Sequence, residues 1–208
     1  MAEIKTSPNY PLSKALWVKA KKEYEKGSRK YHNVEYIEEG FKLMQSLHIK
    51  PTLAQEIAWI AHKVVLDPTS SCNEQKSADW IDSVFKNMQV GEKVIIKEAK
   101  MIIMSTADYI PQVPSAEPIL DIILSRLAVN DANKFDDFAW KLKAESPDFD
   151  EVEWIKRSKV FFQSMLERED VFCLTESKRR WGRRFKENLI NAIQQHPLSQ
   201  KRLFGMDM

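Results

Sequence analysis

The stretch that decides the fold is TLAQEIAWIAHKVVL, residues 52–66 of the 208-residue chain. Most of these residues are apolar, and they do not alternate with polar residues at the period of two that is typical of a half-buried strand. A helix that is apolar on nearly all sides has to be enclosed by other elements. Pro51 fits the first turn of such a helix, and the polar run DPTSS at residues 67–71 predicts a loop after it. The stretch therefore predicts a central, buried helix.

On both sides of this stretch, apolar residues recur at helical spacing, and Gly, Pro or polar clusters separate the segments. The expected helices cover residues 12–26, 31–48, 73–88, 92–106, 119–129, 133–143, 151–168 and 175–195. Asn73 and Thr175 are expected to act as N-caps of their helices. These patterns predict an all-α bundle of about eight or nine helices. We expect a single domain over residues 12–195, with an extended arm over 1–11 and a tail over 196–208.

The composition narrows the class of protein. Hydrophobic residues make up 43% and charged residues 30% of the chain, which is ordinary for a globular domain and argues against wholesale disorder. The two cysteines, Cys72 and Cys173, are far apart and lie in no CxxC motif, so they indicate free thiols in a reducing compartment. Residues 1–14 lack the apolar core of a signal peptide, and no apolar run reaches the about 20 residues of a membrane helix. We expect a cytoplasmic protein without a membrane partner.

Two of the four histidines lie in contexts that belong together. They occur in RKYHNVEYI, residues 29–37, and in WIAHKVVLDP, residues 59–68. Taken singly, each is most simply a hydrogen-bonded structural histidine. The two segments together resemble motifs of the metal-dependent HD-domain phosphohydrolases, and NEQKSA (73–78), TADY (106–109) and LDIILSRL (120–127) resemble further motifs of that family in the same order. Residues 168–175 and 184–189 are similar to its C-terminal segments.

The resemblance implies an HD-domain-like helical fold in which histidines and carboxylates from several helices hold a divalent metal that activates water and neutralises phosphate oxygens. His32 and His62 match ligand positions of the family. The positions that depart from its pattern are, in chain order, Tyr36, Lys63, Tyr109 and Ile123. An ammonium group cannot ligate and repels a divalent cation, and Ile123 has no lone pair. The resemblance therefore implies a degraded metal site without a cofactor, with His32 and His62 as its only remaining ligands.

No catalytic residue stands out, and three interpretations of the altered site remain open. Lys63 could replace the charge of the metal and bind a phosphate-bearing ligand or nucleotide, or the chain could bind a protein partner. A divergent phosphohydrolase could instead act on a nucleotide or phosphoester through a rebuilt site for manganese, magnesium or iron. A plainer alternative is that Lys63 pairs with Glu74 or Asp67 and that the pocket is closed. The residues expected at this relic pocket are Arg29, His32, His62, Lys63, Asp67, Glu74 and Asp121.

A basic stretch opens the last expected helix. Its six cations are Lys178, Arg179, Arg180, Arg183, Arg184 and Lys186. They could contact a nucleic-acid backbone, although the four-residue spacing of Trp181, Phe185 and Leu189 more readily indicates a buried stripe. Cations in the first turns of a helix oppose its dipole, so a carboxylate or phosphate is expected to answer them.

Overall fold

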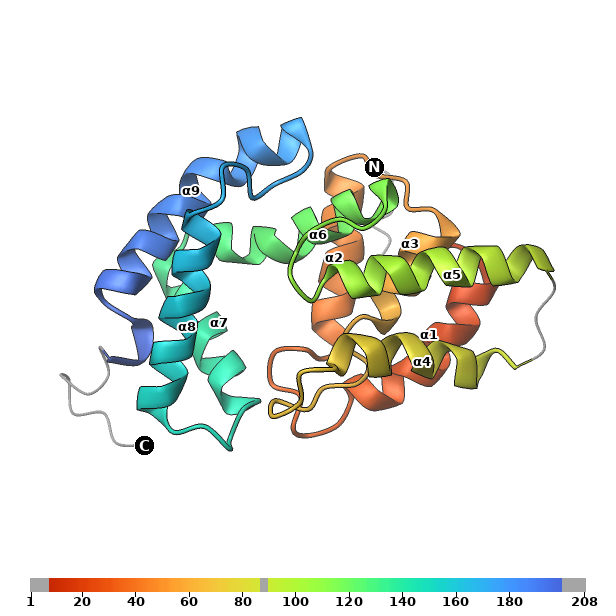
Figure 1. The fold of residues 1–208 in the computed structure, drawn as a ribbon, viewed down its shortest axis with the longest axis horizontal. Coiled ribbons are helices and arrows are strands. Elements are labelled where there is room, and N and C mark those ends of the chain that lie inside the picture. The colour runs from red at the N-terminus through yellow and green to blue at the C-terminus, as the bar shows by residue number, and fades with distance from the viewer. Residues whose placement is uncertain (1–7, 87–89, 200–208) are drawn as a thin grey trace. The chain divides into compact units, whose positions relative to one another are not determined.

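Helix α3 (Leu53–Ala61) is the buried centre of the first part of the chain (Figure 1). The computed structural model describes residues 8–86 and 90–199, and it gives Val90 and Gly91 by their backbone alone. Every residue from Ala54 to Ala61 is buried. Thr52 and Gln55 form a capping box, in which each side chain accepts a hydrogen bond from the backbone N–H of the other. The predicted central helix is thus confirmed, and α1, α4 and α5 pack against it.

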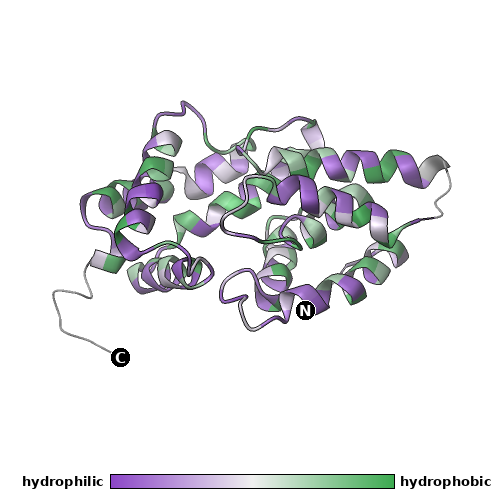
Figure 2. Cartoon of the chain, turned by 60° about the horizontal axis from the view of Figure 1, so that its bottom comes forward, coloured by the Kyte–Doolittle hydropathy of each residue, from purple (hydrophilic) through white to green (hydrophobic). Residues whose placement is uncertain are grey.

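The described residues form helices and no strands, which confirms the predicted all-α class. The other α-helices are α1 (Pro11–Tyr24), α2 (Val34–Ser46), α4 (Asn73–Val84), α5 (Val90–Ser105), α6 (Glu117–Leu124), α7 (Ala132–Ala144), α8 (Glu151–Leu166) and α9 (Thr175–Gln194). Two short 3-10 helices, η1 (Pro114–Ala116) and η2 (Ser125–Ala128), flank α6. Purple and green residues are mixed along most helices in Figure 2, as expected where each helix buries one apolar face.

The chain divides into two compact units, Met1–Ile123 and Leu124–Met208. The predicted single domain over residues 12–195 covers most of each unit, and its bounds stay a prediction. The expected arm and tail fall largely on residues 1–7 and 200–208, which lie outside the described residues. Of the expected tail, His196 and Leu198 are buried.

In the first unit, the carboxylate of Glu56 ties α1 to α3. Glu56 is fully buried and accepts hydrogen bonds from the backbone N–H of Asn9, at 2.9 Å, and from the hydroxyl of Ser13. A carboxylate at a helix N-terminus satisfies donors that have no partner within the helix and interacts favourably with the helix dipole. Glu56 therefore holds the residues that lead into α1 against α3.

Three details of the predicted helix starts were wrong. The helix expected over 31–48 begins at Val34, since the side chain of Asn33 caps it by accepting from Tyr36 N–H at 3.0 Å. Asn73 does not cap α4; its amide bonds the backbone of Asp67 across the preceding loop. Thr175 is the first residue of α9 rather than its cap.

The second unit is built on the amphipathic helix α9, which packs against α8 and η2. Trp181, Phe185 and Leu189 are buried, so the predicted apolar stripe of this helix is confirmed. Beside this stripe, the side-chain amide of Asn188 donates to the carbonyls of Leu127 and Val129, both at 2.9 Å, and holds the end of η2. Among the described residues, no helix is long and apolar enough to cross a membrane.

Candidate functional site

The candidate site surrounds the C-terminal end of α3, which stops at Ala61, five residues before the predicted end at residue 66. A helix leaves its last four carbonyls without intrahelical partners, and here the end is buried. The Ala58 carbonyl accepts from His62 N–H and that of Ala61 accepts from Val64 N–H. The remaining two are bonded by side chains, because His62 Nδ1 lies 2.7 Å from the Trp59 carbonyl and the Tyr24 hydroxyl donates to the Ile60 carbonyl at 2.7 Å.

Arg29 completes this end of the helix. Its two terminal nitrogens donate to the carbonyls of Lys63 and Val64 at 2.7 and 2.8 Å, and its guanidinium lies 5.6 Å from the centre of the Tyr24 ring. A cation at a helix C-terminus is favoured by the helix dipole, and burial raises the pKa of the neighbouring Tyr24 hydroxyl. Of these two residues predicted at the relic pocket, His62 therefore caps the buried helix and Arg29 holds the turn that follows it.

Both ring nitrogens of His62 have hydrogen-bond partners inside the protein. The Trp59 carbonyl can only accept, so Nδ1 carries the proton and the lone pair is on Nε2. The hydroxyl of Tyr36 lies 3.0 Å from Nε2 and donates to it. His62 is fully buried and Tyr36 is 4% exposed. The tyrosine that stands at a histidine position of the resembled family thus occupies the atom with which His62 would ligate a metal.

Aromatic rings pack around this bond. Tyr36 stacks on Trp59 with ring centres 5.3 Å apart, and Trp59 stacks on His62 at 4.7 Å. His32 meets the Tyr36 ring edge-on at 5.1 Å and that of Tyr31 at 4.9 Å. Both predicted histidines therefore contact Tyr36, in a cluster dominated by aromatic rings rather than carboxylates.

Lys63 follows His62 and forms an ion pair with Glu74 of α4. Its ammonium lies 2.8 Å from Glu74 Oε1, and the two side chains are only 16% and 15% exposed. Burial acts to raise the pKa of Glu74, but the charge of Lys63 and its hydrogen bond outweigh burial and lower the pKa below its ordinary value. The plainer sequence interpretation of Lys63 as the partner of an acidic residue agrees with this pair.

Asp67 belongs to the loop that follows α3. Its carboxylate accepts from both the hydroxyl and the backbone N–H of Thr69, at 2.7 and 3.0 Å. The Thr69 hydroxyl bond is the main cause of the lowered pKa of Asp67. Asn73 bonds the Asp67 backbone on the other side, so this carboxylate shapes the loop.

The remaining predicted residues lie on α6 and after α5. Asp121 is fully buried, Ile123 is half-buried, and Tyr109 adopts a positive φ of 59° in the turn after α5. Among the described residues, no group of three or more His, Cys, Asp or Glu side chains is arranged to hold a metal ion. His32, His62 and Asp121 therefore do not form a three-ligand set in this conformation.

The basic stretch on α9 is largely ion-paired. Arg179 pairs with Glu176 of the same first turn at 2.7 Å, and Lys178 pairs with Asp170 at 2.7 Å. Arg183 and Arg184 share Glu187 at 2.7 and 3.1 Å. The hydrogen bond from Arg179 lowers the pKa of Glu176. Carboxylates thus answer the cations near the start of this helix, as the dipole argument predicts.

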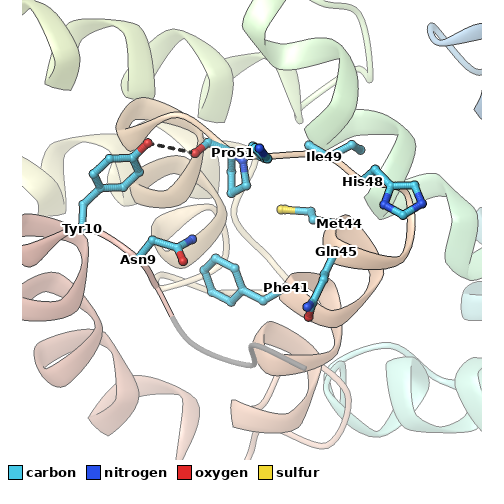
Figure 3. Close-up of a pocket in the computed structure, with 9 residues that line it drawn as sticks. Asn9, Tyr10, Phe41, Met44, Gln45, His48, Ile49 and Pro51 are labelled. Carbon is cyan, nitrogen blue, oxygen red and sulfur yellow. Dashed lines mark hydrogen bonds between the residues drawn. The ribbon is translucent and has the colours of Figure 1, made fainter. Parts of the chain in front are cut away.

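A separate pocket of about 420 Å³ lies at the C-terminal end of α2 (Figure 3). Phe41, Met44 and Ile49 line it, and the Tyr10 hydroxyl donates to the Pro51 carbonyl at 3.3 Å beside it. His48, also at the pocket, has a φ of 57°, and its N–H and that of Ile49 bond back to the Gln45 and Met44 carbonyls. This is a Schellman helix end, where Gly is usual. None of the predicted site residues lines this pocket.

Sequence reasoning missed Tyr24 and Glu56, whose roles are among the clearest in the first unit. Both fit an apolar or amphipathic helical pattern. Tyr24 bonds Ile60, which is 36 residues away in sequence, and Glu56 bonds Ser13, which is 43 residues away. A carboxylate inside the apolar stretch 52–66 was the available signal for Glu56, because a buried charge needs donors. No comparable signal marks Tyr24.

Comparisons with known proteins return no match: no protein-family model, no curated protein and no solved structure is similar to the chain.

Proposed function

We propose that this chain is a non-catalytic, HD-domain-like protein that acts by binding a protein partner. The observation that carries the proposal is the hydrogen bond at 3.0 Å between two buried side chains, the Tyr36 hydroxyl and His62 Nε2. With Nδ1 on the Trp59 carbonyl, His62 has no lone pair left for a metal unless Tyr36 moves. The residues that resemble a metal site support instead the buried end of α3.

The ion pair of Lys63 favours a protein partner over a phosphate-bearing ligand. A phosphate bound at Lys63 would have to displace Glu74 at 2.8 Å and would then lie beside that carboxylate. Repulsion between like charges at a largely buried position is costly. We also infer a reducing, cytoplasmic location, since neither Cys72 nor Cys173 forms a disulfide.

One observation favours a divergent phosphohydrolase as the second candidate. The bond from His62 Nδ1 to a backbone carbonyl is the arrangement that orients a metal-ligating histidine and presents Nε2. Displacement of Tyr36 would free that atom, and Asp121 supplies a buried carboxylate in the same unit. Such an enzyme would hold manganese, magnesium or iron and cleave a nucleotide or another phosphoester.

An activity screen separates the two candidates. The purified full chain is incubated with nucleotides and phosphoesters, with and without Mn²⁺, alongside a His62→Gln variant that is checked for cooperative thermal unfolding. The proposal expects no metal-dependent turnover above the His62→Gln background. Turnover that requires Mn²⁺ and disappears in the folded variant would establish the hydrolase instead.

A thermal-shift screen with the same nucleotides tests the phosphate-binding interpretation. The proposal expects no nucleotide to raise the melting temperature through Lys63. A rise that is lost in Lys63→Ala but retained in a Lys76→Ala control would favour a phosphate-bearing ligand over a protein partner, because Lys76 is an exposed lysine nearby on α4.

A further inference from the structure

The pocket at the C-terminal end of α2 has the size of a small-molecule site (Figure 3). Its volume of about 420 Å³ lies within the range of roughly 300–1,000 Å³ that such sites occupy. The residues that line it come from the segment leading into α1, from α2 and from the chain that follows α2, and all of them belong to the first unit. The proposed function makes no use of this pocket.

The inner wall of the pocket is apolar. Phe41 and Met44 are buried, and Ile49 and Pro51 are half-buried. Figure 3 shows Phe41, Met44 and Pro51 around one space. Burial of an apolar ligand surface against such a wall is favourable, and the flexible thioether of Met44 adapts to the shape of what it contacts. The wall therefore favours a ligand with an aliphatic or aromatic body.

Acceptors beside the pocket are already bonded within the chain. The carbonyls of Met44 and Gln45 accept from backbone N–H groups of the helix end, and the carbonyl of Pro51 accepts from the Tyr10 hydroxyl at 3.3 Å. Of the residues that the structure describes, no Asp or Glu lines the pocket. The buried carboxylate of Glu56 is bonded to donors at the start of α1. The pocket therefore offers little to a ligand that brings a cation or several donors.

Two basic side chains at the pocket have no partner within the described part of the chain. His48 and Lys50 are exposed, and neither side chain forms a hydrogen bond or an ion pair there. An ammonium group can only donate, and an imidazole carries an N–H in either protonation state. His48 also has a φ of 57°, at a helix end where Gly is usual, so an imidazole stands here at a cost in stability. The rim therefore presents donors and positive charge.

We propose that this pocket binds a small organic carboxylate with an apolar body. The body packs against Phe41, Met44 and Ile49, and the carboxylate accepts from Lys50 and His48. The C-terminus of a peptide has related chemistry, but peptide carboxylates are typically captured by free backbone N–H groups. Here the N–H groups of His48 and Ile49 are bonded to α2 carbonyls, which favours a free small molecule. The inference does not rest on the protein-binding function proposed above.

The test titrates four probes into the full chain and follows ¹H–¹³C spectra of its methionine and isoleucine methyl groups. Octanoate has both the apolar body and the carboxylate, octanol lacks the charge, octylamine reverses it, and acetate lacks the body. Octanoate is expected to shift the Met44 and Ile49 methyl signals with a Kd on the order of 0.1–1 mM. Octanol and octylamine should bind at least about fivefold more weakly, and acetate should leave both signals in place.

Three variants test the basic rim. Lys50→Gln and His48→Gly are each expected to weaken octanoate binding about threefold, as removal of one exposed charged or donating group does. Lys42→Gln is the control, because Lys42 is an exposed lysine of α2 that does not line the pocket, and it should leave binding within about 1.5-fold of wild type. His48→Gly should also raise the melting temperature by about 2–4 °C, since Gly adopts positive φ freely. Higher stability together with weaker binding distinguishes a ligand-binding histidine from one that only shapes the helix end.

Absence of any octanoate-induced shift of the Met44 and Ile49 signals would overturn the proposal, as would equal or tighter binding of octanol or octylamine. Octanoate binding that Lys50→Gln and His48→Gly leave unchanged would overturn the assignment of its carboxylate. Tighter binding of the tripeptide acetyl-alanyl-glycyl-leucine than of octanoate would overturn the proposal in favour of a peptide C-terminus.

Discussion

Two glycines in helices mark two different kinds of region in this molecule. At Gly40 of α2, a Cβ would fall 1.9 Å from Cζ2 of the buried Trp59, whereas at Gly182 of α9 it would meet no atom within 4 Å. Gly40 belongs to the aromatic and hydrogen-bonded interior around His62, where internal packing accounts for each residue. Gly182 belongs to a surface groove for which internal packing gives no account. The difference separates a helical glycine that internal packing requires from one that internal packing does not require.

The largest expected effect is at Gly40. Gly40→Ala should lower the free energy of unfolding by about 3 kcal/mol or more, because the added methyl forces Trp59 out of its position against the backbone. Urea denaturation measures the change, with Gly182→Ala as the matched control, which should be about 1 kcal/mol more stable than wild type. Equal effects of the two substitutions would remove the distinction between the regions.

Both units also bury a histidine, and acid should distinguish them. Burial lowers the pKa of His196 to about 4, with a further contribution from Lys159, and its ring stacks on Phe162 with centres 6.3 Å apart. Between pH 6.5 and 4 the unfolded chain binds a proton at this residue that the folded chain does not. His196 therefore leaves the free energy of unfolding unchanged above pH 6.5. As the pH drops from 6.5 toward 4, its burial lowers the free energy of unfolding, by at most about 3 kcal/mol.

The measurement is the difference between the pH–stability curves of wild type and His196→Leu, which keeps an apolar side chain at the position. The curves should diverge from each other across this window and run parallel above it. Parallel curves throughout would mean that His196 is accessible to protons in the folded protein.

A smaller effect is expected at the centre of the candidate site. Tyr36→Phe keeps the ring that stacks on Trp59 and removes the hydroxyl that bonds His62 Nε2. A buried nitrogen that loses its partner costs about 1–3 kcal/mol, so the variant should be destabilised by about that amount in urea denaturation. Unchanged stability of Tyr36→Phe would indicate that the bond is not formed in solution.

The ion pair of Lys63 with Glu74 should contribute least. The lowered pKa of Glu74 means that the pair stabilises the protein above the ordinary pKa of a glutamate and that this contribution is lost as pH falls through the lower, folded-state pKa. A double-mutant cycle with Lys63→Met and Glu74→Gln at neutral pH should give a coupling of about 1 kcal/mol, since the pair keeps some exposure to water. A coupling near zero would make Lys63 a candidate for binding a ligand again.

The sequence predicts the helices and their buried faces well, because periodicity records which side of each helix is covered. The burial of α3 and the stripe of Trp181, Phe185 and Leu189 are cases of this kind. It does not predict where α3 ends, because its last carbonyls are satisfied by Tyr24 and His62, and Tyr24 comes from another helix. Pairings over such sequence distances are set by packing, which a single sequence does not record.

The same limit applies to the candidate site. The resemblance groups His32 and His62 as matching ligand positions and Tyr36 and Lys63 as substituted ones. The structure brings His32, Tyr36 and His62 into one cluster. The direction of each hydrogen bond, however, depends on the tautomer of His62, which follows from the Trp59 carbonyl rather than from residue type. The metal-free interpretation is therefore a prediction about the state of that ring.

The most direct test of the account is the state of the His62 ring in solution. Long-range ¹H–¹⁵N correlation spectra of the imidazoles at neutral pH, recorded before and after addition of Mn²⁺, report both the tautomer and the access of metal to Nε2. The account predicts a neutral ring protonated on Nδ1, with signals that Mn²⁺ leaves in place because Tyr36 occupies Nε2. Selective broadening of the His62 and His32 signals by Mn²⁺ would contradict it and would identify a working metal site.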